Sequence, residues 1–580
     1  MQFDFPGINF WFYFFILNNL IVVPVYLLQK DSNKLWPFSG FNKFSLSRKI
    51  RLLFFRYNQD IFRVCADLAV IALVLLLIKN LVPINYFLVP VSLYIFLMLV
   101  LSVYYSFFRK VYNKEPKDAD GIQLFKIGYE IVKHGEKRKF FTGVLMISAI
   151  LLVVLTLTYL WLEAISKFDA GVFSYGILMF ICLMPVIFKL FFHFRYLLLH
   201  RSIMFFGSEF FKIIKSVLLN YRLIKQINIA DIICQAPDIK PSLTSKPNFI
   251  FLFLESYGKI LIDSKHESNL YATYIRETES DLTENGWYAA TALSQSPVSG
   301  GESWIAYSSM LYGFNVQNQS LYEHLLNSSQ LHDYPMLFRL LRKNGYTTYW
   351  TNGIPGFEDL KVPWDTYKDF YGIDHWIKFN DLKYKGQLYS FGPCPPDQFT
   401  INFSLKQARE NSSQPFCWHF LTQNSHSPFA PIAQFYNNWK DANVLPDQSN
   451  KQVRFLSKPV ITDYFKAMEY NWKVVHQLLL ESCTENDIII VAGDHQPPFF
   501  TNLNNGTETP VHIISKNKSF IASFIEQGYN SGFQPSDKQA VIKHEGFFTT
   551  FINAWLAAYD SNKGTVSSKP DGINIFANEA

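Results

Sequence analysis

The stretch SPVSGGESWIAYSSML, residues 296–311, contains a hydroxyl at a point where the chain could do chemistry. Gly300 and Gly301 allow a tight turn, and the apolar spacing after Ser303 predicts a helix that begins near this serine. Free N–H groups at a helix start attract anions, so a serine there could be a nucleophile toward an anionic substrate. The alternative is an N-cap serine, and the two interpretations are compatible because both place the hydroxyl at the helix start.

Three further side chains could hold a divalent metal ion. Asp494 and His495 end the apolar run DIIIVAGDH, and Glu255 ends the apolar run NFIFLFLES. Carboxylates and imidazoles are ligands of hard and borderline divalent ions. Each residue alone could instead cap a turn or pack, but the similar placement on two runs favours a metal site. A metal ion that also bound Ser303 would lower the pKa of its hydroxyl.

The elements that must position these residues predict an α/β fold. The runs at 248–256 and 487–495 suit central strands covered on both faces. Residues 334–352 predict a helix, a glycine turn and a strand, residues 415–429 a strand and a loop, and residues 464–482 an amphipathic helix. This alternation predicts a mostly parallel central sheet over residues 246–580. Ligands of such sheets bind beyond the carboxyl ends of strands, where His426 also lies.

The first two hundred residues have a different composition. Five apolar runs approach the length of a membrane span, which is about 20 residues. They cover residues 8–28, 62–82, 85–107, 140–163 and 172–194. We therefore expect a transmembrane domain of about five α-helices over 1–200. An interfacial helix and a linker follow over 201–245, because 203–219 is amphipathic and the next segment is polar with two prolines.

The side of the membrane on which the C-terminal domain lies is less clearly indicated. The segments 30–60 and 108–139 are rich in lysine and arginine, and the positive-inside rule places both in the cytoplasm. With five spans the C-terminal domain would then be cytoplasmic as well. Four or six spans, or one run that does not span, would reverse this outcome.

Composition argues against a nucleic-acid partner. The net charge is +6 over 580 residues, but the basic residues cluster beside the apolar runs, which favours lipid headgroups or topology signals. None of the six cysteines has the paired spacing of a zinc or redox site. We expect buried free thiols, with a disulfide among the last four as the alternative.

The order of the motifs NFIFLFLES, SGGES, TQNSHSPF, AGDHQPP and ETPVHIIS resembles the sulfatase-type branch of the alkaline phosphatase superfamily. It is most similar to lipoteichoic acid synthases and phosphoglycerol transferases, in which about five membrane spans precede an extracytoplasmic sulfatase-like domain. The motifs cover about residues 246–520, and the N-terminal half is similar in layout only. The resemblance implies a multi-pass protein of the inner or plasma membrane with an extracytoplasmic catalytic domain.

The resemblance also assigns roles to individual residues. It implies that Glu255, Ser303, Asp494 and His495 bind a single metal ion, Mn²⁺ or Mg²⁺ first and Zn²⁺ as a further option. Ser303 would be the nucleophile, with Gly-Glu-Ser in place of the family's Gly-Lys-Thr. His426, in Ser-His-Ser-Pro-Phe, matches the histidine on the substrate side.

The sequence departs from the family pattern at several positions. The nucleophile is a serine where the family usually has threonine. The arginine that contacts phosphate has no clear match in GIPGFEDLKVPWDTYKDFYGID, where Lys361 is a weak substitute. No Cys/Ser-x-Pro-x-Arg motif is present near Ser303, which argues against a formylglycine sulfatase. His512 could be a further metal ligand or phosphate contact, or a structural histidine within a strand.

These observations predict a membrane-anchored, metal-dependent transferase. It would move a phosphoglycerol- or phosphoethanolamine-like headgroup from a lipid donor to an envelope glycan or lipid acceptor, through a covalent Ser303 intermediate. The alternatives are a phosphate- or sulfate-ester hydrolase of the same superfamily and a catalytically silent membrane receptor or scaffold. The sequence gives no indication of the oligomeric state.

Overall fold

The computed structural model describes residues 6–27, 64–111, 137–191, 203–204, 206–263, 267–355, 364–389, 393–444, 459–501, 506–535 and 542–575. The chain forms two compact units. The first comprises Met1–Lys110 with Lys114–Asn220, and the second comprises Tyr221–Ala580 with Val111–Asn113.

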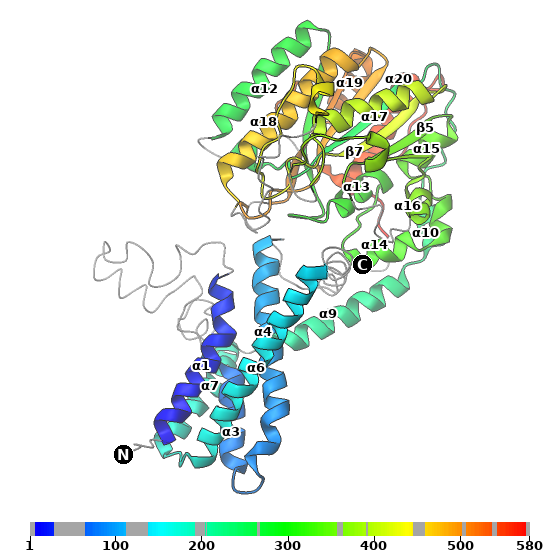
Figure 1. Cartoon of the computed structure of the whole chain (residues 1–580). Coiled ribbons are helices and arrows are strands. Elements are labelled where there is room, and N and C mark those ends of the chain that lie inside the picture. Colours follow the sequence, from blue (N-terminus) through cyan, green and yellow to red (C-terminus); the bar gives the residue numbers. More distant parts are fainter. Residues whose placement is uncertain are drawn as a thin grey trace, which may run out of the picture. The chain divides into compact units, whose positions relative to one another are not determined.

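Each of the five apolar runs forms a helix of the first unit (Figure 1). These helices are α1 (Pro6–Leu27), α3 (Ala66–Ile78), α4 (Leu88–Val111), α6 (Lys137–Lys167) and α7 (Val172–Phe191). A short parallel pair joins β1 (Val64–Cys65) to β2 (Ile203–Met204). The predicted helices are confirmed as helices.

Fewer of these helices than predicted are shown to be long and apolar enough for a membrane span. Among the described residues, Ile84–Tyr104 and Phe141–Lys167 are long and apolar enough, at 21 and 27 residues. Within the described residues, three further apolar helical segments are shorter: Gly7–Val22, Ala66–Ile78 and Val172–Leu183. The expectation of about five spans is therefore not confirmed.

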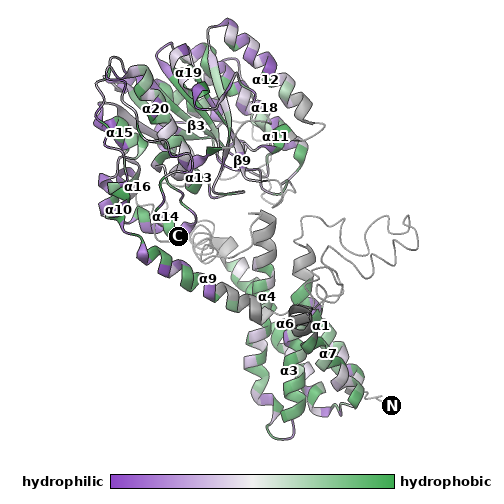
Figure 2. Cartoon of the chain, turned by 180° about the vertical axis from the view of Figure 1, so that it is seen from behind, coloured by the Kyte–Doolittle hydropathy of each residue, from purple (hydrophilic) through white to green (hydrophobic). Residues whose placement is uncertain are grey.

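Helix α6 leaves most of its apolar surface uncovered within its unit. Only 11% of its most apolar window is buried, and Leu145 and Leu152 are 70% and 65% exposed. Figure 2 shows the hydrophobic colour along the described parts of these N-terminal helices. A core helix of a soluble protein would bury this surface, whereas a helix in contact with lipid does not need to.

The predicted amphipathic segment lies in helix α9 (Phe206–Gln226), which is followed by the short helix α10 (Ile229–Cys234). Exposed apolar side chains of α9 include Phe211, Leu218 and Tyr221. The interfacial position of this helix, and the domain limits at 201 and 246, stay predictions.

The second unit is built on a nine-stranded sheet. Its main order is β10-β4-β9-β8-β3-β7-β5-β6, and β11 pairs with β4. The strands are β3 (Asn248–Leu254), β4 (Tyr288–Gln295), β5 (Thr347–Asn352), β6 (His375–Lys378), β7 (Phe416–Leu421), β8 (Asp487–Gly493), β9 (Glu508–Ser515), β10 (Asn530–Ser531) and β11 (Ile542–Lys543).

Helices pack on both faces of this sheet (Figure 1). One face is covered by α12 (Glu267–Glu284), α17 (Asp397–Asn411) and α18 (Ile461–Gln477), and the other by α13 (Ser303–Tyr312), α15 (Leu337–Lys343), α19 (Lys518–Glu526) and α20 (Phe547–Tyr559). The remaining α-helices are α11 (Ile260–Asp263), α14 (Gln319–Leu326) and α16 (Trp364–Tyr371).

The prediction of a mostly parallel sheet is wrong, because the sheet is mixed. Strands β8, β3, β7, β5 and β6 are parallel neighbours, but β9 is antiparallel to both β8 and β4, and β10 is antiparallel to β4. The cause is the connection after β8. A parallel neighbour is usually reached through a crossover helix, and the described residues between β8 and β9 form no helix.

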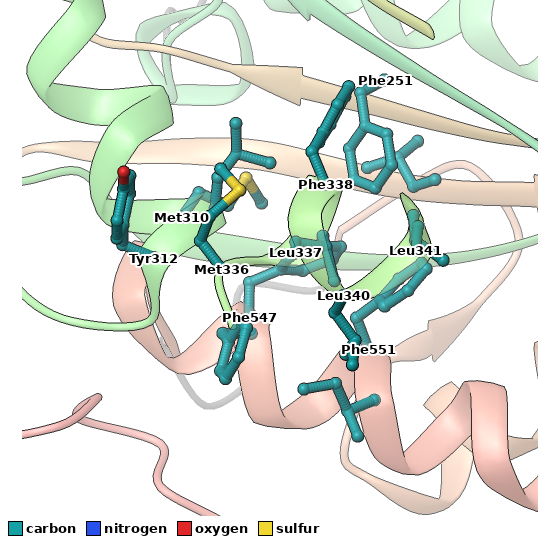
Figure 3. Packing of buried hydrophobic residues seen from close by; sticks show 14 of the residues in the cluster. Phe251, Met310, Tyr312, Met336, Leu337, Phe338, Leu340, Leu341, Phe547 and Phe551 are labelled. Carbon is teal, nitrogen blue, oxygen red and sulfur yellow. The ribbon is translucent and has the colours of Figure 1, made fainter. Parts of the chain in front are cut away.

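The apolar run of β3 is buried on both faces, as its composition predicts. Phe249, Phe251 and Phe253 join one core, and the alternate residues join the other. On the first of these faces, Met310 of α13 lies near Leu337 and Phe338 of α15 (Figure 3). This packing fixes α13, and with it the position of Ser303 at the helix start.

Strand β7 also carries a buried histidine in apolar surroundings. The His419 ring stacks on Trp350 with ring centroids 3.4 Å apart, and it contacts Phe253 and Tyr307. Neither ring nitrogen forms a hydrogen bond within the described part of the chain. Burial lowers the pKa of His419 well below its ordinary value, so the folded domain holds the neutral form.

This histidine should make the domain sensitive to acid. Below about pH 6.5 the unfolded chain binds a proton at this residue and the folded chain does not, so the free energy of unfolding falls as pH falls. The slope is about 1.4 kcal/mol per pH unit for one such group. We expect His419→Phe to remove that contribution, as measured by denaturant unfolding of the detergent-solubilised chain at pH 7.5 and 5.0. The exposed His332 provides the control variant His332→Asn, and equal slopes for His419→Phe and wild type would contradict the prediction.

Candidate active site

The register of three neighbouring strands brings the predicted residues together. Leu254 of β3 pairs with Gly493 of β8 in parallel, so Glu255 and Asp494 leave the sheet side by side. Close approach requires glycine at position 493, since a Cβ there would collide with the carbonyl oxygen of Tyr257. Strand β7 pairs with the other side of β3 and ends nearby, before the loop that carries His426.

Ser303 enters this site from the start of helix α13. Gly301 and Glu302 both adopt left-handed backbone conformations, with φ of 69° and 61°. Ser303 is the first residue of the helix, and the preceding residue makes no side-chain cap. The hydroxyl donates to Glu255 Oε2 at 3.0 Å and lies 3.4 Å from His495 Nε2. The serine therefore points toward the candidate metal ligands and does not act as an N-cap.

Two carboxylates and one imidazole converge beside this hydroxyl. Oxygen or nitrogen atoms of Glu255, Asp494 and His495 lie within 4.8 Å of one another, and all three residues are buried. His495 Nε2 is 3.4 Å from Glu255 Oε1 and 3.4 Å from Asp494 Oδ2. The side chains form one compact group of possible ligands.

The two carboxylates of this group carry more negative charge than its single imidazole can balance. Burial, followed by the negative charge of Glu255, raises the pKa of Asp494 to about 7. Burial alone would lower the pKa of His495, but Asp494 and Glu255 outweigh this effect and raise it. A divalent cation among these side chains would stabilise both carboxylates in their charged form.

The hydrogen bonds of the three residues also fit a metal ion. Asp494 Oδ1 accepts from the backbone N–H groups of Ser256 and His495, while the buried Oδ2 accepts no hydrogen bond within the described residues. His495 Nδ1 faces the carbonyl oxygen of Gln496 at 2.8 Å, so this nitrogen carries the hydrogen. Nε2 of the neutral ring then presents its lone pair to the cluster, as in metal-bound histidines.

The remaining predicted residues have different surroundings. His426 is half-buried. Burial lowers its pKa, His495 lowers the pKa further, and Asp494 raises it by less than these effects. Its Nδ1 faces the carbonyl oxygen of Ser427 at 2.8 Å. His512 lies in the sheet, where its ring nitrogens bond to Tyr257 and Thr291, which is the arrangement of a structural histidine. Lys361 lies outside the described residues.

Four polar residues around Glu255 were not predicted. Ser256, with φ of 62°, donates its hydroxyl to Glu255 Oε1. Thr422 and Ser425 bond to the Glu255 backbone, and Asn471 bonds to both of these residues. Ser256 follows directly after the candidate metal carboxylate in the motif LES, so the sequence offered a signal for it. The other three have no distinctive local pattern.

The family model described as Sulfatase matches residues 247–512. These residues form a sulfatase-family domain. The match confirms the sulfatase-type resemblance of the motifs and supports an enzyme of the sulfatase family, with transfer or hydrolysis left open. A search of curated proteins by sequence found no match.

Several solved structures are similar to this chain at low identity. The lipoteichoic acid synthase LtaP from Listeria monocytogenes has 16% identity, a TM-score of 0.36 and coverage of 60% of this chain and 81% of its own. The integral membrane phosphoethanolamine transferase EptA from Neisseria meningitidis has 12% identity, a TM-score of 0.44 and coverage of 94% and 95%. The phosphoglycerol transferase GacH from Streptococcus pyogenes has 15% identity, a TM-score of 0.33 and coverage of 62% and 88%.

The charge balance of the sulfatase domain predicts a response to added metal. Mn²⁺ at 100 times its Kd should raise the free energy of unfolding by about 2.7 kcal/mol, because only the folded chain assembles the ligands. Asp494→Asn should abolish the response, and without metal it should unfold no more easily than wild type, since carboxylate repulsion is relieved. Thermal unfolding with and without Mn²⁺ measures both effects. The exposed Asp333 supplies the control Asp333→Asn, and a Mn²⁺ response retained in Asp494→Asn would contradict the assignment.

Proposed function

We propose that this protein is a membrane-anchored, metal-dependent transferase that moves a phosphate-bearing headgroup from a lipid to an envelope glycan or lipid. The observation that carries the proposal is the Ser303 hydroxyl, 3.0 Å from Glu255 Oε2 and beside Asp494 and His495. A hydroxyl among metal ligands at a helix start suits a nucleophile that attacks an anionic phosphorus centre.

Glu255, Asp494 and His495, with the Ser303 hydroxyl, would hold one divalent ion. When bound, this ion would neutralise negative charge on the phosphate oxygens and favour loss of the serine proton. The donor set accommodates Mn²⁺, Mg²⁺ or Zn²⁺, since it combines carboxylate oxygens with one imidazole.

The chain's own residues would then support two successive transfers. In the first, a bond forms between Ser303 Oγ and phosphorus, the bond from phosphorus to the lipid alcohol breaks, and the alcohol leaves with a proton. His426, on the loop after β7, would carry the proton that Ser303 loses to the leaving alcohol. In the second, a hydroxyl of the acceptor gives up its proton and attacks the phosphoserine, which restores Ser303.

The N-terminal unit would keep the sulfatase domain at its lipid donor. The exposed apolar surface of α6 supports a position in the membrane. We infer a multi-pass protein of the inner or plasma membrane with the catalytic domain outside the cytoplasm, since lipid-linked envelope acceptors are found there. Water in place of the acceptor would make the same site a hydrolase. The assembled cluster is better suited to either reaction than to a silent receptor.

Ser303→Ala should reduce turnover of a lipid phosphodiester by at least about 10³-fold, because the nucleophile is removed. Mn²⁺ affinity should fall much less, since the three other ligands remain. Intact-mass measurement after incubation with a lipid extract should show a phospho-headgroup adduct on wild type and none on the variant. Ser303→Thr is the matched control, because it keeps the hydroxyl. Full turnover by Ser303→Ala would exclude this mechanism.

His426→Gln should distinguish proton transfer from simple packing. For an alkyl phosphodiester the rate should fall by about 10²–10⁴-fold, because the leaving alcohol needs a proton. For an aryl phosphodiester, whose phenolate leaves readily without one, the loss should be much smaller. Comparison of kcat for the two substrates gives the result. An equal loss on both would argue against a role for His426 in protonating the leaving group.

A further inference from the structure

The backbone of Glu255 is held on both sides by two buried hydroxyl groups. Thr422 Oγ1 accepts a hydrogen bond from the Glu255 N–H at 2.9 Å. Ser425 Oγ donates to the Glu255 carbonyl oxygen at 2.8 Å. Both residues follow β7, so these two bonds fasten the end of β3 to the loop after its neighbour. The position of the Glu255 carboxylate therefore depends on where the two hydroxyls are kept.

A single side chain from a third element holds both hydroxyls. Asn471, on helix α18, directs its Nδ2 to Ser425 Oγ at 2.8 Å and to Thr422 Oγ1 at 3.3 Å. It is 1% exposed. Because Nδ2 carries two hydrogens, one amide group can serve both partners.

The directions of these bonds require Asn471 to be the donor in its bond to Ser425. The only hydrogen of the Ser425 hydroxyl is given to Glu255, so Ser425 can only accept from Asn471. Asn471 Oδ1, by contrast, has no hydrogen-bond partner among the residues that the structure describes. A buried amide with one unsatisfied end is unusual. Its two donors are thus the part of the side chain that the surroundings use.

We propose that Asn471 is a positioning residue for the metal site, acting through Ser425 and Thr422 on the backbone of Glu255. Asn471 touches neither the metal ligands' side chains nor Ser303 by any hydrogen bond in the described structure. Partners of metal ligands commonly set affinity by orienting them. The inference rests on the proposed metal-dependent function of the same site.

The test compares Mn²⁺ affinity of the full-length, detergent-solubilised chain with that of Asn471→Leu, measured by titration calorimetry with Mn²⁺ alone. Leucine keeps the approximate volume and removes both donors. We expect the Kd for Mn²⁺ to rise by about 10–100-fold. Should Asn471→Leu fail to fold, Ser425→Ala removes one link of the same chain and is expected to raise the Kd by about 10-fold.

Asn402→Leu is the matched control. Asn402 is also a buried asparagine on a helix, and it bonds to Gln398 and Ser482 instead of the residues around Glu255. It should lower the melting temperature as Asn471→Leu does, but change the Kd less than twofold. In the double variant Asn471→Leu with Ser425→Ala, the second substitution should add little, because both act through the same bond.

The outcomes separate this inference from the function on which it rests. Weak Mn²⁺ binding by Asn471→Leu with normal binding by Asn402→Leu supports the positioning role. Equal Mn²⁺ affinity of wild type and Asn471→Leu, with only the melting temperature lowered, overturns it and leaves the proposed function intact. A wild-type chain that binds no Mn²⁺ overturns both.

Discussion

The central constraint in this structure is the placement of two carboxylates side by side in a dry interior. The pairing of Leu254 with Gly493 sends Glu255 and Asp494 out of the sheet together, with His495 between them. Two like charges about 5 Å apart repel by roughly 3 kcal/mol at an effective dielectric constant of about 20. Natural domains seldom keep such a pair without compensation. The surrounding features are therefore best understood as parts of a cation site: glycine at 493, the left-handed turn before Ser303, and the orientation of the His495 ring.

Much of the fold could be predicted where local pattern decides the outcome. The runs at β3 and β8 are apolar on both faces because both faces are covered, and Gly345, with φ of 85°, separates α15 from β5 as its position predicted. Strand direction was not predictable in the same way. The direction of β9 depends on its partner and on the length of the preceding loop, and neither is recorded in its own residues. The number of spans likewise depends on the lengths of the apolar helices, and among the described residues two helices are long and apolar enough to span a membrane.

The sequence predicts those residues of the candidate site that lie in motifs at strand ends or at a helix start and follow the family's order. Glu255, Ser303, Asp494 and His495 were found in this way, and the structure brings them together. His512 shows the limit of the method, because a histidine in a strand looks the same from the sequence whether or not its nitrogens are occupied. The residues that hold Glu255 were missed for a similar reason. Hydroxyls and amides become informative only when their partners, distant in the sequence, are known.

A further constraint concerns how the direction of the Ser303 hydroxyl is fixed. Threonine, usual in the family that the motifs resemble, has a branched Cβ that restricts its χ1 angle. Serine lacks this restriction and must be held by its surroundings. In this chain it is 8% exposed, it lies at a helix start fixed by the packing of α13, and its hydroxyl bonds to Glu255. The position of the Glu255 carboxylate thereby also affects the direction of the Ser303 hydroxyl. A shift of Glu255 would displace a candidate metal ligand and the proposed nucleophile together, so the proposed chemistry needs a firmly held end of β3.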